Sequence, residues 1–295
     1  MNTVLSVIIA ALFGASVGFS VTLVFNRLPE SWLQDYGYDV KSPDFRLAKR
    51  MKLYPHGVIS AVLVTAFYVM AALTLYNRYI ETFRPIHLAV ILLLAPVVIV
   101  VMMSDRLNRI IPDQCSLFIL ILGVLSIAGD LVEGSLWFSP EAKWFAPIIN
   151  RVLAMLIGYG LLWLINFLCV TFLGKEGMGQ GDMKLLGACG LLVGCYGLAV
   201  VLYVGFVTAL FFALPLYIRK RLRIRNEKKE IANAEDPAAK RREIMLAKKN
   251  MHFADDPDYL AFGPFLAFGA AVFICAEKFF FLRIIGFFVL AGLYF

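Results

Sequence analysis

Long apolar runs separated by short polar stretches fill the chain from end to end. A membrane span needs roughly 20 mostly apolar residues to cross a hydrocarbon core of about 30 Å. The pattern therefore predicts an all-α polytopic membrane protein with about eight transmembrane helices and short loops. We expect these spans at about 3–25, 57–76, 87–104, 115–133, 150–173, 185–196, 197–218 and 259–276. A last apolar run at 279–295 fits a ninth span, a half-span or an interfacial helix.

The first apolar run resembles a signal peptide only in being apolar and N-terminal. It has no basic start, and no small-x-small cleavage site is followed by a polar stretch. We expect it to be a retained span.

Composition excludes an ordinary soluble domain. The chain is 61% hydrophobic and only 17% charged, with a mean hydropathy of +0.78, whereas a soluble domain has about a quarter of its residues charged. The five cysteines lie inside or at the edges of apolar runs and form no CxxC pair, so we interpret them as small core residues. They are Cys115, Cys169, Cys189, Cys195 and Cys275.

The net charge of +7 is unevenly distributed. Lys and Arg concentrate at 27–52 and 219–249, whereas 77–86 and 134–149 carry few. Because cytoplasmic loops carry an excess of Lys and Arg, the two basic regions are predicted to face the cytoplasm and the N-terminus the outside.

This orientation divides the chain into five segments. They are a first transmembrane helix (1–25), a cytoplasmic segment (26–56), a transmembrane core (57–218), a basic cytoplasmic loop (219–258) and a C-terminal transmembrane region (259–295). Within the core, the connections at 105–114 and 174–184 are predicted to be cytoplasmic as well.

The basic loop does not indicate nucleic-acid binding. Acidic residues interrupt it, and attraction to anionic membrane lipid explains a juxtamembrane basic tract more simply. The stretch "NAEDPAA" is expected to divide the loop into two short helices.

Charged groups at membrane depth are costly and usually functional. Five carboxylates lie in or at the end of a predicted span: Asp105, Asp130, Glu133, Asp182 and Glu277. Asp130, Glu133 and Glu277 occupy span ends where water is available, and we expect them to be solvated caps.

Asp105 and Asp182 differ from the other three. Asp105 ends the run "AVILLLAPVVIVVMMSD", and Asp182 begins a span after the glycine-rich "GMGQGD". Both are predicted at the cytoplasmic mouth, where they can face one another. Two adjacent carboxylates cannot both ionise cheaply, so one holds a proton while the other acts as a base. Such a pair can activate a water for attack on a peptide carbonyl.

The glycines before Asp182 fit that chemistry. Gly177, Gly179 and Gly181 lack a Cβ, which permits φ > 0 and lets an extended substrate backbone approach the aspartate. The spacing alone is equally compatible with a tight turn in which Asp182 only caps the following helix.

Three motifs and an N-terminal segment resemble those of the type IV prepilin peptidases, the GxGD class of intramembrane aspartyl proteases. "SDRLNRIIPDQCSL" resembles the first aspartate motif, with Pro112 seven residues after Asp105, and "EGMGQGDMKLLGACG" resembles the second. "FGPFLAFGA" near the C-terminus and "GASVGFSVTLVFNRLP" near the N-terminus resemble further family segments.

The resemblance implies an enzyme of the bacterial cell membrane that removes the basic leader of prepilins or pseudopilins at the cytoplasmic face. It implies that Asp105 and Asp182 are the catalytic pair. It gives a supporting role to Glu176 and Lys184, which flank the second aspartate.

The segment 26–56 departs from the family pattern. Many members carry two CxxC pairs here, suited to structural zinc, but this segment has no cysteine. Zinc is therefore not expected, and the segment must fold by other means, for which Trp32, Tyr36 and Tyr38 are candidates. Many members also methylate the new N-terminus with S-adenosylmethionine. No glycine-rich nucleotide-binding pattern occurs here, so methylation stays open.

Two functions of other classes compete. A proton-coupled transporter would use the two aspartates as a relay, but transporters commonly carry internal repeats, and "GMGQGD" occurs once. A silent scaffold for a pilus or secretion assembly would be expected to have lost an aspartate. Among related proteases, a presenilin-like enzyme would carry P-A-L in place of "FGPF", and preflagellin peptidases generally lack "FNRLP".

Overall fold

The described part of the structure, a computed structural model, contains only helices as regular secondary structure. It comprises residues 3–34, 41, 46–75, 84–138, 143–174, 177–234, 236–249 and 260–290. The helices are α1 (Thr3–Arg27), α2 (Val58–Leu75), α3 (Pro85–Asn108), α4 (Asp113–Val132), α5 (Ala146–Leu173), α6 (Gln180–Ala232), α7 (Pro237–Lys249), α8 (Gly263–Cys275) and α9 (Glu277–Leu290), with short helical turns at Glu30–Trp32 and Leu53–Gly57.

The long helices have the length and composition of membrane spans. Six of those described are long and apolar enough to cross a bilayer, and the bent pair α8 and α9 would add a seventh. Large apolar side chains stay exposed on their outer faces, for example Leu12 at 67% and Leu210 at 66%, as expected where lipid is the solvent. The prediction of an all-α polytopic membrane protein is confirmed.

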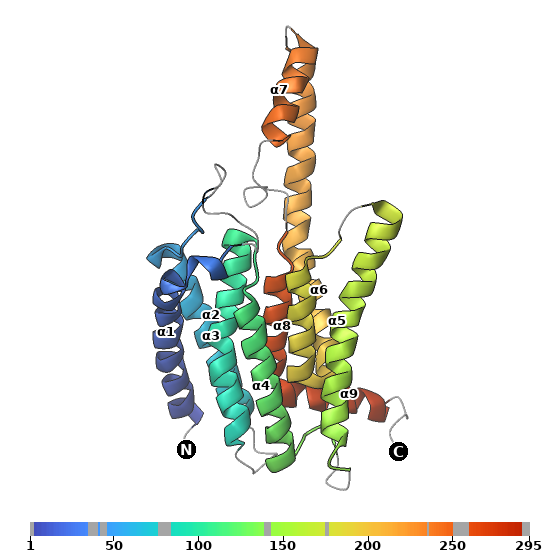
Figure 1. Cartoon of the computed structure of the whole chain (residues 1–295). Helices are drawn as coiled ribbons and strands as arrows, with labels where there is room; N and C mark the ends of the chain where they lie inside the picture. The colour runs from blue at the N-terminus through green and yellow to red at the C-terminus, as the bar shows by residue number, and fades with distance from the viewer. Residues whose placement is uncertain are drawn as a thin grey trace.

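Two ends of this bundle must be distinguished. At one end, which we call the basic end, α1, α3 and α5 finish and α4, α6 and α8 begin. The second half of α6 and α7 project beyond the bundle on this side, whereas the N-terminus and α9 lie at the opposite end (Figure 1). The α3–α4 connection at the basic end is short because Arg109 adopts a left-handed conformation (φ 61°) and Pro112 directly precedes α4.

Helix α6 contains a break at Gly194, where the backbone leaves helical geometry (φ 74°, ψ 179°). A Cβ at this position would lie 2.5 Å from the side-chain amide nitrogen of Asn150, so only glycine fits. The break falls inside the predicted run 185–196, two residues before its expected end.

The two arms of α6 run in opposite directions. The start of α8 contacts both arms, because Gly263 lies beside Asp182 and Phe265 lies beside Gly205. In one straight helix, Asp182 and Gly205 would be about 35 Å apart. The chain therefore turns back at Gly194 and forms two antiparallel arms, which account for the two separate apolar runs in the sequence.

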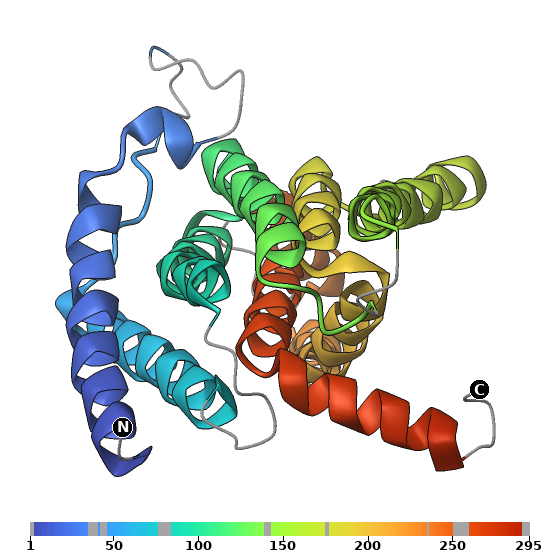
Figure 2. The ribbon, with the colours of Figure 1, turned by 90° about the horizontal axis from the view of Figure 1, so that it is seen from below.

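Helices α8 and α9 meet at an angle of 81°. Helix α8 has 13 residues, which at 1.5 Å per residue makes it about 20 Å long, shorter than a hydrocarbon core. Helix α9 runs across the opposite end of the bundle (Figure 2). Of the three fates considered for the C-terminal run, its direction favours an interfacial helix.

The carboxylates expected to be solvated caps are buried, and that expectation is wrong. The side chains of Asp130, Glu133 and Glu277 are 5–7% exposed. All three surround Arg84, with nitrogen–oxygen distances of 3.5–3.9 Å, and Asp130 also pairs with Arg151 at 2.7 Å. The sequence places each carboxylate at a helix end, where water would be expected to solvate it. The arginines that pair with the carboxylates instead of water come from other parts of the chain.

The basic loop is helical, as predicted, but differently divided. Helix α6 continues without a further break to Ala232, so the first of the two expected short helices is the end of a long arm. Helix α7 is the second. The interruption between α6 and α7 lies in the predicted "NAEDPAA" stretch.

Polar contacts hold the connection between α1 and α2. Arg50 pairs with Glu30 at 2.5 Å, and the Asn108 side chain accepts a hydrogen bond from the Lys49 amide at 2.7 Å. The second contact ties this connection to the end of α3. Of the aromatic residues proposed to organise this segment, Trp32 is half-buried, whereas Tyr36 and Tyr38 lie outside the described residues.

Candidate active site

Asp105 and Asp182 are both buried at the basic end. Asp105 is 4% exposed and lies one turn before the end of α3, and Asp182 is 8% exposed in the first turn of α6. Asp105 lies near the end of α3 and Asp182 near the start of α6, each next to an irregular connection. Both carboxylates are therefore close to the bundle surface without being exposed.

The two carboxylates converge on Gly263, the first residue of α8. A Cβ on Gly263 would lie 2.8 Å from Asp105 Oδ2 and 3.1 Å from Asp182 Oδ1. These oxygens are therefore at most about 6 Å apart. A glycine is required here because any side chain would occupy the space between the carboxylates.

Ile111 packs beside the pair. It lies 2.5 Å from the Cβ position of Gly263 through Cδ1 and 3.2 Å from that of Gly181 through Cβ. The short α3–α4 connection carries it there. Pro112 is buried in this connection and its carbonyl accepts the amide hydrogen of Cys115 at 3.0 Å, so Pro112 shapes the start of α4.

The three glycines before Asp182 provide space, not unusual backbone angles. The glycines with positive φ among the described residues are Gly134, Gly174 and Gly194, so the three glycines before Asp182 do not use the positive φ that glycine permits. A Cβ on Gly177 would meet Cys169 Sγ at 2.5 Å, whereas one on Gly179 would meet only Asp182 Oδ2, at 3.4 Å. Gly179 thus leaves an open approach to the carboxylate.

Lys184 forms an ion pair with Asp113, at 2.8 Å, that joins the first turn of α6 to the first turn of α4. Both side chains are partly exposed, at 45% and 34%. The other flanking residue proposed from the sequence, Glu176, lies outside the described residues.

One carboxylate oxygen has an unfilled hydrogen-bonding capacity. Among the described residues, Asp182 Oδ1 is buried and has no hydrogen-bond partner. Buried polar atoms are normally paired, so this oxygen is available to a water or a substrate group. The part of the chain that the structure describes contains no cluster of three or more His, Cys, Asp or Glu residues able to hold a metal.

The sequence singles out the aspartates, the glycines and Lys184, but does not predict that Gly263, Ile111 and Asp113 lie beside them. Gly263 lies within "FGPFLAFGA", and the other two lie within "SDRLNRIIPDQCSL". The motifs therefore contain these three residues, but only long-range packing brings the residues together.

Fold and site together define a class of protein, an all-α polytopic membrane protein that buries a pair of aspartates near one end. Residues 92–214, which include both aspartates, match the type IV leader peptidase family.

Several curated proteins named prepilin leader peptidase/N-methyltransferase are similar to the chain. The Dichelobacter nodosus protein is 24% identical over 259 residues, covering 74% of this chain and 86% of that protein. The Aeromonas salmonicida protein is 31% identical, over 43% of this chain and 39% of its own length. The Neisseria gonorrhoeae protein is 36% identical, over 26% and 27% respectively. No solved structure matches the chain significantly.

Proposed function

We propose that this protein is a membrane aspartyl endopeptidase that removes the basic leader peptide of type IV prepilins or pseudopilins. The family match and the names of the relatives support the substrate class. The observation that carries the chemistry is the convergence of Asp105 and Asp182 on one point beside Gly263.

In the proposed reaction the two carboxyl groups share the acid and base roles. One is ionised and removes a proton from a water, whose oxygen attacks the carbonyl carbon of the scissile peptide bond. The other is protonated and donates its proton to the carbonyl oxygen, giving a tetrahedral diol. Collapse of the diol returns one hydroxyl proton to the carboxylate that acted as the acid, the carboxyl group that took the proton from water gives it to the amide nitrogen, and the carbon–nitrogen bond breaks.

The basic end is proposed to face the cytoplasm of a bacterial cell membrane. The connections at this end include the basic regions 27–52 and 219–249, and such an excess of Lys and Arg is typical of cytoplasmic loops. A substrate with its leader in the cytoplasm and its apolar helix in the bilayer would then present its cleavage site at the depth of the aspartates.

The position of the pair favours a protease over a proton-coupled transporter. Both aspartates lie within the first or last turns of their helices, whereas transporter sites lie near the bilayer midplane.

A second proposed activity, N-methylation of the new N-terminus, rests on the names of the relatives. S-adenosylmethionine would supply the methyl group. The described pocket between α4, α5 and α6 does not suit it, because its lining is mostly apolar, with Asp113, Ser116, Tyr159 and Lys184 as the polar exceptions.

Purified protein in lipid vesicles, incubated with a prepilin and labelled S-adenosylmethionine, tests both proposals. Mass spectrometry is expected to show loss of the leader, and the label reports methylation separately. An intact prepilin, under conditions in which a control peptidase cleaves the same sample, would overturn the main proposal.

A further inference from the structure

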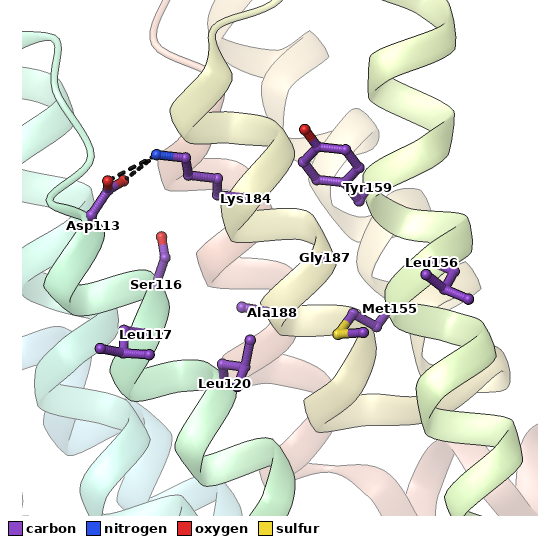
Figure 3. Close-up of a pocket in the computed structure, with 10 residues that line it drawn as sticks. All are labelled: Asp113, Ser116, Leu117, Leu120, Met155, Leu156, Tyr159, Lys184, Gly187 and Ala188. Atoms are coloured by element: carbon purple, nitrogen blue, oxygen red, sulfur yellow. Dashed lines mark hydrogen bonds and ion pairs between the residues drawn. The ribbon is translucent and has the colours of Figure 1, made fainter.

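A pocket of about 460 Å³ lies beside the candidate active site, between α4, α5 and the first arm of α6. Figure 3 shows the Lys184–Asp113 ion pair at one end of its lining and Leu120 and Met155 toward the other. Its volume lies within the range of ligand sites.

The pocket opens toward lipid. Leu117 on α4 and Leu156 on α5 line it and are 58% and 60% exposed. An occupant therefore enters sideways from the bilayer, which restricts it to an apolar helix or a lipid chain.

One polar group inside the pocket distinguishes these two occupants. Ser116 lines the pocket and is only 6% exposed, and its hydroxyl has no hydrogen-bond partner among the described residues. The first turn of any α-helix has four backbone N–H groups without intrahelical acceptors. The Ser116 hydroxyl can accept from one of them, whereas an acyl chain would leave the hydroxyl unsatisfied.

The path from the pocket to the aspartates is short. Asp182 and Lys184 are two positions apart, so they lie on different faces of α6. An extended chain that crosses the N-terminus of α6 spans one helix diameter, about 10 Å, with roughly three residues. It would pass over Gly179, where a Cβ would meet only Asp182 Oδ2.

We propose that this pocket docks the first turn of the substrate's apolar helix, with Ser116 accepting a backbone hydrogen bond from it. This inference rests on the proposed peptidase function and extends it, because it assigns a binding surface to the part of the substrate that stays in the membrane. The residues just after the scissile bond would cross the glycine-rich loop, and the helix would begin in the pocket.

Photo-crosslinking locates the occupant. A photoreactive amino acid is placed at Leu156, with Leu210, which is exposed to a similar extent on the second arm of α6, as the matched control. Both variants also carry Asp105→Asn to retain uncleaved purified prepilin. We expect an adduct from position 156 to prepilin residues shortly after the cleavage site, and none from position 210.

Kinetics tests the hydrogen bond. Ser116→Ala is expected to raise KM for full-length prepilin about tenfold, or about 1.4 kcal/mol of binding, with kcat unchanged. Ser126→Ala, at a buried serine elsewhere on α4, should leave KM unchanged. A peptide truncated before the apolar helix should be cleaved equally by the wild type and the Ser116→Ala variant.

The outcomes separate the two proposals. Crosslinks from position 156 to phospholipid alone, with normal cleavage by the wild type, would overturn the docking proposal and leave the peptidase function intact. Failure of the wild type to cleave any prepilin would overturn both.

Discussion

Gly263 and Asp105 meet so closely that a single methyl group would separate the aspartate pair: a Cβ on Gly263 would lie 2.8 Å from Asp105 Oδ2. Gly263→Ala is therefore expected to push the carboxylates apart. Because a misplacement of about 1 Å can cost about 100-fold in rate, we expect kcat for leader cleavage to fall by about that factor, measured with purified protein.

Gly160→Ala is the matched control, because a Cβ there meets nothing within 4 Å. It should cleave at the wild-type rate. Wild-type kcat in Gly263→Ala would show that the pair tolerates a displaced α8 and does not depend on this contact.

The Lys184–Asp113 pair is expected to matter for rate more than for stability. Exposed ion pairs contribute about 0–1 kcal/mol, so Lys184→Met should change the unfolding midpoint little. The pair does link α6 to the connection that carries Ile111, and loosening it should lower kcat by about three- to tenfold. The exchanged variant Lys184→Asp/Asp113→Lys is expected to recover most of the lost kcat. If the exchange restores neither kcat nor KM, the pair does not have a positioning role.

The ion cluster at the opposite end is expected to stabilise the fold. Arg151 pairs with Asp130 and also donates to the carbonyls of Leu191 and Leu192, at the end of the first arm of α6. Arg151→Met would leave Asp130 buried without this partner, at a cost of about 3–5 kcal/mol.

Thermal unfolding in detergent measures this effect, and the midpoint should fall by roughly 10 °C. Lys240→Met, which removes an exposed pair with Glu243, should leave the midpoint unchanged. Equal midpoints for the two variants would contradict a stabilising role for the cluster.

The break in α6 predicts a contrast between two glycines with positive φ. Gly194→Ala forces a positive φ with extended ψ, a region almost restricted to glycine, and adds a clash with Asn150, whereas Gly174→Ala only adopts a left-handed conformation, because nothing lies within 4 Å of its Cβ position. Left-handed backbone costs a non-glycine residue roughly 1–2 kcal/mol. Gly194→Ala should therefore lower the unfolding midpoint clearly more than Gly174→Ala, and the reverse order would contradict the geometry of the turn.

Local patterns were sufficient for much of the fold and for the identity of the aspartates. Apolar run lengths located the spans and indicated two separate runs, 185–196 and 197–218, close to the point where the chain turns back at Gly194. The paired aspartates stood out because each lies at an apolar boundary beside an irregular connection.

Long-range packing determines what the sequence did not reveal. Asp130 and Glu277 looked like ordinary helix ends because Arg84, which neutralises them, comes from a different part of the chain. Gly263 belongs to a motif whose local sequence contains no charge, and its role becomes visible only where α3, α6 and α8 meet.

Conservative replacement of each aspartate tests the central claim most directly. Asp105→Asn and Asp182→Asn keep the size of the side chain but remove its ability to exchange a proton. Each is expected to reduce leader cleavage of a co-expressed prepilin by at least about 1,000-fold while the protein remains inserted in the membrane. Cleavage at the wild-type rate by either variant would contradict the assignment of these two residues as the catalytic pair.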